Sequence, residues 1–231
     1  DTVYPDLSEY KNKEFKVHLT EKVGNNIWYR GTLDGKTVWL HSNDVYSATK
    51  SRTSILGHLK SANVNIYETI GGKSFKATDY THAVYYIKEQ AVSDGQTYYL
   101  ISTEPSNTRG VVGWVKKEDM SAHPHTVVDK HNKVYYLKGT GKAYTKAWGG
   151  RKDLVFDDLS SYKGEMFRVH LTEKVGENVW YRGTLAGKTV WIHSKEVEEP
   201  QGERTSILGH LKSADVNIYE SIGGKSFKAS D

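Results

Sequence analysis

A lysine-rich stretch in the second half of the chain has the residue types needed to bind a polyanion. Residues 130–152 read KHNKVYYLKGTGKAYTKAWGGRK and include no acidic residue. Ammonium groups neutralise phosphates and release counterions, and aromatic rings cover apolar edges of a polymer. The candidate binding residues are Lys130, Lys133, Lys138, Lys142, Lys146, Arg151, Lys152, Tyr135, Tyr144 and Trp148, together with Arg182 of a Trp-Tyr-Arg run. The alternative is a solvated face that keeps the protein soluble.

Other residues with chemical potential do not assemble into a catalytic or metal motif. His123, His125 and His131 lie near one another in sequence, but no HExxH motif or paired carboxylate accompanies them. We therefore expect no metal, no cofactor and no enzyme activity. Three further histidines, His18, His41 and His58, recur as His170, His193 and His210. Because they are duplicated with the surrounding sequence, we predict that they make structural hydrogen bonds.

The elements that must position these residues are repeated. The segment GTLDGKTVWLHSNDV at residues 31–45 returns as GTLAGKTVWIHSKEV at residues 183–197, and 54 of 74 positions match between residues 6–79 and 158–231. Repeats of this kind indicate an array of small units. We expect the chain to be a piece of a longer protein.

Mismatches between the two copies locate the unit boundaries. Residues 46–51 and 198–203 differ at every position while both flanks agree, which predicts a linker. A third ending of the same kind, GVVGWVKKEDM, lies at residues 110–120. These features predict a partial module at 1–46, a module at 52–120, a basic module at 121–198 and a partial module at 204–231. The alternative is that the chain divides into three modules of similar length, at residues 1–79, 80–152 and 153–231.

Composition favours an all-β fold. The chain has 16 Tyr, 6 Trp and no Cys among its 231 residues, and short alternating runs rich in β-branched and aromatic residues are typical of strands. Trp39, Trp114 and Trp191 recur at the module ends, where we expect them to pack.

Residues 52–120 carry a net charge of +1 (eight basic, seven acidic) and residues 121–197 carry +5 (thirteen basic, eight acidic). We expect the partial modules to leave strand edges and apolar faces uncovered, to be completed by residues outside this sequence or by another chain.

The module endings resemble those of a known family. Gly113-Trp114, with the variants Val38-Trp39 and Val190-Trp191, and the alternation of two module types are similar to the GW repeats that follow the amidase domain of staphylococcal bifunctional autolysins. The resemblance implies tandem SH3-like half-open barrels joined by short linkers. It also implies a secreted, non-catalytic segment at the bacterial cell surface that holds a murein hydrolase on the envelope.

The resemblance implies that lipoteichoic acid is the main partner and that peptidoglycan is a second candidate. It also implies that the chain associates with the membrane only through lipoteichoic acid. An alternative is an adhesin-like module that binds host matrix proteins or peptides through SH3-type aromatic grooves, for which Tyr85-Tyr86 or Tyr135-Tyr136 are candidates. Nucleic acid is not an expected partner because no base-reading element is present.

Overall fold

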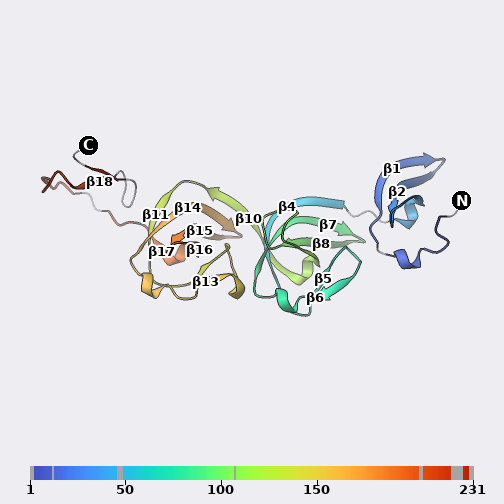
Figure 1. The fold of residues 1–231 in the computed structure, drawn as a ribbon, viewed down its shortest axis with the longest axis horizontal. Coiled ribbons are helices and arrows are strands. Elements are labelled where there is room, and N and C mark those ends of the chain that lie inside the picture. Colours follow the sequence, from blue (N-terminus) through green and yellow to red (C-terminus); the bar gives the residue numbers. More distant parts are fainter. Residues whose placement is uncertain are drawn as a thin grey trace. The chain divides into compact units, whose positions relative to one another are not determined.

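The protein is built from strands and short 3-10 turns. A computed structural model describes residues 3–11, 13–45, 49–106, 108–202, 205–219 and 226–228. The chain forms two compact units, residues 1–123 and 124–231. Within the described ranges no α-helix occurs, and no helical segment has the length and apolarity to cross a bilayer. The expected class, all-β with tandem open SH3-like barrels, is confirmed (Figure 1).

The N-terminal half module, residues 6–45, is a three-stranded antiparallel sheet. After the turn η1 (Ser8–Tyr10), the strands β1 (Lys16–Val23), β2 (Asn26–Leu33) and β3 (Lys36–His41) pair in the order β1-β2-β3, and the turn η2 (Ser42–Asp44) follows. A bulge shifts the register of β1 between Val17 and Leu19. Both outer strands have no further pairing among the described residues of this sheet.

The first barrel contains residues 49–123. Its strands are β4 (Thr49–Leu59), β5 (Asn65–Tyr67), β6 (Ser74–Lys76), β7 (Val84–Ser93), β8 (Gln96–Ser102), β9 (Val111–Lys116) and the start of β10 (Met120–Asp129), with turns η3 (Thr78–Tyr80) and η4 (Lys117–Asp119). The strand order is β10-β4-β7-β8-β9-β5-β6. Fully buried Ile66, Ile87 and Ile101 lie in one core with Tyr85 and Tyr99.

The second barrel contains residues 124–198 and repeats this plan. After the end of β10 come β11 (Lys133–Leu137), β12 (Ala143–Tyr144), η5 (Arg151–Asp153), β13 (Leu154–Phe156), η6 (Ser160–Tyr162), β14 (Met166–Val175), β15 (Asn178–Leu185), β16 (Lys188–His193), η7 (Ser194–Glu196) and β17 (Val197–Glu198). Its core includes Leu137, Leu159, Phe167 and Ile192, all fully buried.

Local sequence explains the hairpins. Asp94 and Gly95 both have positive φ, +49° and +72°, between β7 and β8. Ala186 and Gly187, at +46° and +74°, do the same between β15 and β16. Two residues with φ above zero form the tight turn that matches strand twist. The linker prediction was partly wrong, because Thr49 to Ser51 belong to β4 and pair with Val92 to Gln90 of β7; residues 46–48 lie outside the described ranges.

The C-terminal half module, residues 205–228, retains only part of the plan. Strands β18 (Asn217–Tyr219) and β19 (Ser226–Lys228) form a two-stranded hairpin with Ile218 opposite Phe227. This pairing repeats that of Ile66 with Phe75 in the first barrel. The preceding residues, 205–214, form no strand. The hairpin therefore keeps its local register without a core beneath it.

Candidate polyanion-binding surface

Two lysines of the basic stretch are held in ion pairs. Lys146 Nζ lies 3.3 Å from Asp153 Oδ1, and the two side chains are 18% and 5% exposed. Lys133 Nζ lies 2.5 Å from Asp129 Oδ2. This contact and a hydrogen bond from the backbone of His131 lower the pKa of Asp129 well below its usual range. Both carboxylates lie one residue outside the 130–152 window, so the local positive charge is smaller than the sequence window suggests.

The Lys146–Asp153 pair stabilises a turn rather than offering charge to a ligand. Asp153 accepts a hydrogen bond of 2.9 Å from the Gly150 backbone N–H, and its own N–H donates to Gly150 O. Trp148 lies within this turn, half-buried and with a positive φ of +57°. Burying a carboxylate is costly unless it is paired and hydrogen-bonded. Lys146 therefore balances a buried charge inside the barrel.

Lys138 and Lys142 differ from Lys133 and Lys146 in the groups that surround their ammonium groups. Lys138 is exposed, and its ammonium donates to the Lys195 backbone carbonyl at 2.9 Å. Lys142 is exposed, and its positive charge contributes to a lowered pKa of Asp158, for which hydrogen bonds from Ser160 are the largest cause. Neither lysine has its charge neutralised by burial against a carboxylate.

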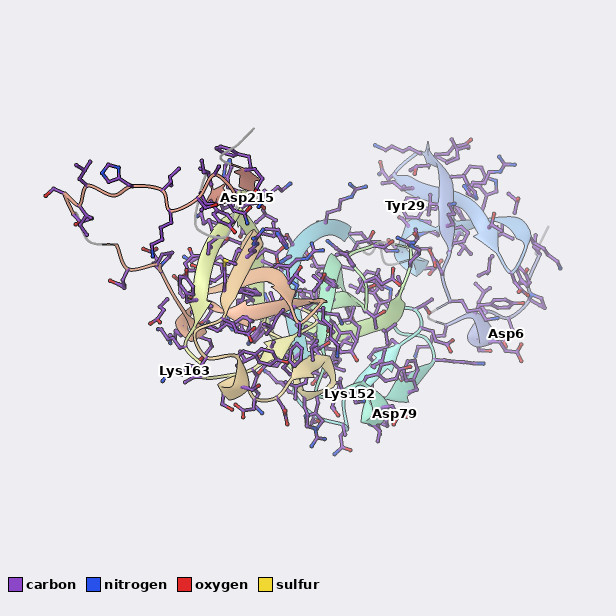
Figure 2. All side chains as sticks on the ribbon, turned by 60° about the vertical axis from the view of Figure 1, so that its left-hand side comes forward. Asp6, Tyr29, Asp79, Lys152, Lys163 and Asp215 are labelled. Carbon is purple, nitrogen blue, oxygen red and sulfur yellow. The ribbon has the colours of Figure 1, made fainter. Side chains whose placement is uncertain are left out.

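Exposed cations remain at several points on the second barrel. The candidates in this group are Lys130, Lys138, Lys142, Arg151, Lys152 and Arg182. Lys163 and Arg168 are also exposed cations of this barrel, although they lie outside the lysine-rich stretch at residues 130–152. Figure 2 labels Lys152 and Lys163. The exposed charge is therefore spread over the turns and over strands β14 and β15.

Arg182 lies in a row with two aromatic residues across three strands. It pairs with Trp191 of β16, and Trp191 pairs with Tyr144 of β12. The Tyr144 ring also meets Trp180 edge-on, with centroids 5.9 Å apart. Burial raises the pKa of Tyr144, and nearby Glu196 adds to the shift. The barrel thus places the exposed Arg182 guanidinium in one row with half-buried Tyr144, whereas Trp180 and Trp191 are only 6% and 7% exposed.

Tyr135 belongs to the core rather than to the surface. It is 8% exposed and stacks on Tyr181, with ring centroids 4.7 Å apart and an interplanar angle of 21°. Burial, then a hydrogen bond with Tyr135, raises the pKa of Tyr181 to about 12. The first barrel buries Tyr85 in the same way, at 3% exposure. Each predicted tyrosine pair therefore leaves only its second member, Tyr86 or Tyr136, half-buried at the surface.

The predicted packing tryptophans differ in exposure. Trp114 and Trp191 are each 7% exposed, whereas Trp39 of the half module is 40% exposed. The first two are therefore well placed to pack, and the third lacks a cover.

A family model for the GW (Gly-Tryp) dipeptide domain matches residues 1–46, 49–121 and 125–198. The chain belongs to this family. It is 25% identical over 191 residues to the bifunctional autolysin of Staphylococcus aureus strain Mu50, covering 82% of this chain and 15% of that protein. The protein of the same description from strain COL is 25% identical over 137 residues, covering 59% of this chain and 11% of its own length. The chain thus spans a small fraction of the curated relatives it matches.

A solved structure also matches. It is described as an autolysin from Listeria monocytogenes, with 18% identity, a TM-score of 0.38 and coverage of 82% of each chain.

The glycine of the one literal Gly-Trp pair has a packing role. Gly113 has φ of +154°, and a Cβ there would lie 2.7 Å from Ile66 Cγ2 and from Tyr67 O. The register of β8 and β9 shifts at this point. In the other two GW modules, valine occupies the position, as Val38 and Val190. Glycine is therefore required by close approach of β5 in the first barrel alone.

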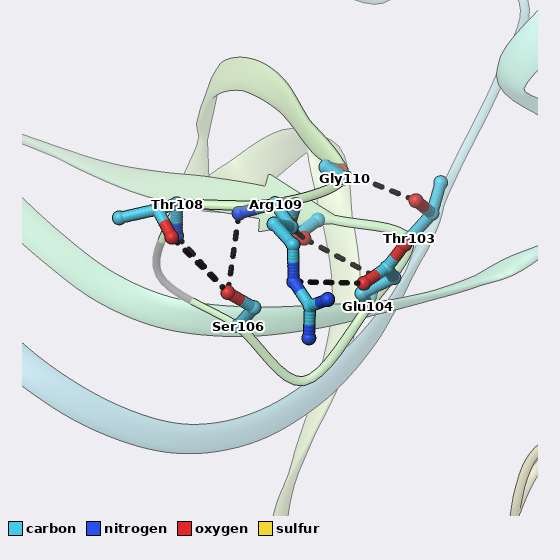
Figure 3. Close-up of polar contacts among 7 residues, drawn as sticks. Thr103, Glu104, Ser106, Thr108, Arg109 and Gly110 are labelled. Atoms are coloured by element: carbon cyan, nitrogen blue, oxygen red, sulfur yellow. Dashed lines mark hydrogen bonds and ion pairs between the residues drawn. The ribbon is translucent and has the colours of Figure 1, made fainter.

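The two GW barrels differ around the equivalent tryptophan. Leu100 pairs with Trp114 in the first barrel, where Arg182 pairs with Trp191 in the second. The first barrel instead places Lys50 Nζ 5.6 Å from the Trp114 ring centroid. Its β8–β9 connection is also longer and is closed by an exposed ion pair of 3.7 Å between Arg109 and Glu104 (Figure 3). The arginine–tryptophan row is a feature of the basic module type, since Arg30 also pairs with Trp39.

Two of the three duplicated histidine pairs, His18 with His170 and His41 with His193, make the structural hydrogen bonds that the sequence predicts. His193 Nδ1 accepts from the Lys195 N–H at 3.0 Å, and its Nε2 pairs with Asn178 at 3.2 Å. His41 makes the same two contacts with Asn43 and Asn26. Burial lowers the pKa of His193. Among the described residues, no group of three or more His, Asp or Glu side chains is placed to hold a metal ion.

Proposed function

We propose that this chain is a non-catalytic targeting segment that binds lipoteichoic acid at the bacterial cell surface through its second barrel. Membership of the GW family and similarity to bifunctional autolysins support a targeting role. In this proposal the chain is secreted and holds a murein hydrolase on the wall. The proposed modules are 1–46, 52–120, 121–198 and 204–231.

The observation that carries the proposal is the charge left exposed on the second barrel. Lys130, Lys142, Arg151 and Arg182 are exposed, and Arg182 lies beside Trp191 in register. A glycerol phosphate polymer presents anionic groups at short intervals and no fixed fold. Dispersed cations can follow such a polymer without a closed pocket, and each contact neutralises one phosphate.

Repetition increases the apparent affinity. The N-terminal half module repeats the arginine–tryptophan pair as Arg30 and Trp39. Linked weak sites raise apparent affinity on the order of 10² to 10⁴ through effective concentration. We therefore propose that several basic modules engage one polymer, and that membrane association arises only through the lipid of that polymer.

Binding to immobilised polymers tests the proposal. The intact chain is passed over purified lipoteichoic acid, over peptidoglycan stripped of teichoic acid, and over a host matrix protein such as fibronectin, in parallel. The proposal expects retention on lipoteichoic acid that salt elutes. Retention on peptidoglycan alone or on the matrix protein alone, insensitive to salt, would contradict it and favour the alternative ligands.

A further inference from the structure

A positive and a negative side chain lie near Tyr144 on the second barrel. Arg182 of β15 is opposite Trp191 of β16, and Trp191 is opposite Tyr144 of β12, so the three side chains share one face of the sheet. Neighbouring strands are about 4.8 Å apart, which places the Cα atoms of Arg182 and Tyr144 about 10 Å apart. Arg182 is exposed and Tyr144 is half-buried. The guanidinium and the phenol are therefore the parts of this row that a ligand can reach.

Glu196 lies near the tyrosine, on the turn that follows β16. A Cβ added at Gly141 would lie 2.6 Å from Glu196 Cγ, so this side chain lies against the turn that leads into β12. Glu196 Oε2 accepts a hydrogen bond from the Thr140 hydroxyl. The carboxylate also contributes to the raised pKa of Tyr144, for which burial is the larger cause. A carboxylate has lone pairs for further hydrogen bonds, and half-buried Glu196 can therefore accept one from a ligand.

Neither of these two charges has an ion-pair partner in the described part of the chain. No described carboxylate lies within ion-pair distance of Arg182, and no described ammonium or guanidinium lies within that distance of Glu196. The two groups therefore do not pair with each other. Lys133 and Lys146 of the same barrel, by contrast, each pair with an aspartate. The opposite charges of Arg182 and Glu196 are thus available to two different groups of one ligand.

Packing orders the tyrosine ring before any ligand binds. A Cβ at Gly149 would lie 2.7 Å from Tyr144 Cβ and Cδ1, so the Gly149 backbone lies against this side chain. Trp180 meets the ring edge-on. Because the pKa of Tyr144 is raised, its hydroxyl stays protonated at neutral pH and can donate a hydrogen bond to an anion. The face of a tyrosine ring also attracts an ammonium group. An ordered ring loses little conformational entropy on binding.

The first barrel keeps the tyrosine but not the arginine. Tyr67 takes the place of Tyr144 opposite the tryptophan. Leu100 takes the place of Arg182 on the other side of that tryptophan. The combination of an arginine, a tyrosine and a carboxylate therefore distinguishes the second barrel from the first.

We propose that Arg182, Tyr144 and Glu196 form a site for a phosphodiester that carries a primary ammonium group in the same repeating unit. Arg182 and the Tyr144 hydroxyl bind the phosphate, and Glu196 and the tyrosine ring bind the ammonium. On a glycerol phosphate polymer, an aminoacyl ester on the glycerol hydroxyl places its ammonium roughly 8 Å from the phosphorus when extended. This length is comparable to the spacing of the row. The inference rests on the proposed function, because it names the form of the polymer that the second barrel prefers.

Two lipid-free glycerol phosphate oligomers of equal length test the site. One carries alanyl esters and the other N-acetylalanyl esters, so only the first has ammonium groups. In calorimetry, the intact chain is expected to bind the alanyl oligomer about fivefold more tightly, because it gains an exposed ion pair and a cation–π contact. General attraction to cations predicts the reverse, since the acetylated oligomer has the more negative net charge.

The outcomes of this comparison separate the inference from the proposed function. Equal affinities, or tighter binding of the acetylated oligomer, would overturn the inference and leave polymer binding in place. Binding of neither oligomer would overturn the proposed function, and the inference with it.

Matched charge variants assign the preference to the three residues. Glu196→Gln is expected to abolish the fivefold preference, and glutamine keeps an acceptor oxygen for the Thr140 hydroxyl. Glu199→Gln removes the same charge from an exposed residue that lies near Lys133 and Tyr181 instead. This control is expected to retain the preference. Equal losses in the two variants would overturn the site.

A vesicle assay separates two sources of the same chemistry. Phosphatidylethanolamine also joins a phosphodiester to a primary ammonium, so phosphatidylcholine vesicles with and without this lipid are sedimented with the intact chain. The inference expects binding of the alanyl oligomer and no additional sedimentation with phosphatidylethanolamine. Sedimentation with phosphatidylethanolamine, without binding of the lipid-free oligomer, would overturn the polymer as the ligand of the site.

Discussion

Removal of four exposed cations from the second barrel should flatten the salt dependence of lipoteichoic acid binding. The variant changes four residues to Gln: Lys130, Lys138, Lys142 and Arg182. None of these four side chains is in an ion pair with a buried carboxylate. For a flexible polyanion, each neutralised phosphate adds about 0.7 to the slope of log affinity against log salt. Loss of four contacts should lower the slope by about 2.8. Over a fourfold rise in salt, the wild type should therefore lose about 50-fold more affinity than the variant loses.

A matched variant on the first barrel separates local contact from net charge. Lys60, Lys73, Lys76 and Lys117 are all exposed, and their change to Gln removes the same four charges. Titration calorimetry at several salt concentrations gives the slope for each protein. The control should keep a slope within about 0.7 of the wild-type value, the equivalent of one contact. Equal losses in the two variants would refute the assignment to the second barrel and leave only a general charge effect.

Three further predictions concern stability. Lys146→Met should destabilise the second barrel by about 3 kcal/mol in urea unfolding, because it leaves buried Asp153 without its ion pair; no loss would contradict a structural role for this lysine. Gly113→Ala should cost about 1–3 kcal/mol through overlap with Ile66 and Tyr67, whereas a Cβ at Gly187 meets open space, so Gly187→Ala should cost about 1 kcal/mol, from its positive φ alone. The pKa of Tyr181 is raised to about 12, so this residue should stabilise the fold below pH 10 and lose that contribution as pH rises from 10 to 12. In an absorbance titration at 295 nm, the tyrosine that ionises at the highest pH should be missing from the Tyr181→Phe variant.

The fold was largely predictable because the sequence repeats itself and alternates with the period of strands. Matched copies revealed the array, and short alternating runs such as residues 97–101 and 133–137 lie in strands. The linker prediction was wrong for residues 49–51, which belong to β4. Mismatch between copies reports tolerance of substitution, and the outer half of β4 tolerates it because Thr49, Lys50 and Ser51 are exposed while their backbone pairs with β7.

The binding surface was harder to predict because charge counts ignore pairing in space. Lys133 and Lys146 entered the candidate set although Asp129 and Asp153, one residue beyond the window, pair with them. Tyr135 was included although alternation along β11 sends it and Leu137 into the core. The neighbourhood of Arg182 and Trp191 could have been found, since the two-residue turn at Ala186-Gly187 fixes the hairpin register.

Amide chemical-shift mapping with a defined glycerol phosphate oligomer tests the central claim most directly. The intact chain, labelled with ¹⁵N, is titrated at low and high salt. Binding through the second barrel predicts shifts at Tyr144, Arg151, Arg182 and Trp191, fading together as salt rises, with little change around Trp114. Shifts concentrated on the first barrel, or shifts that persist unchanged at high salt, would contradict the claim.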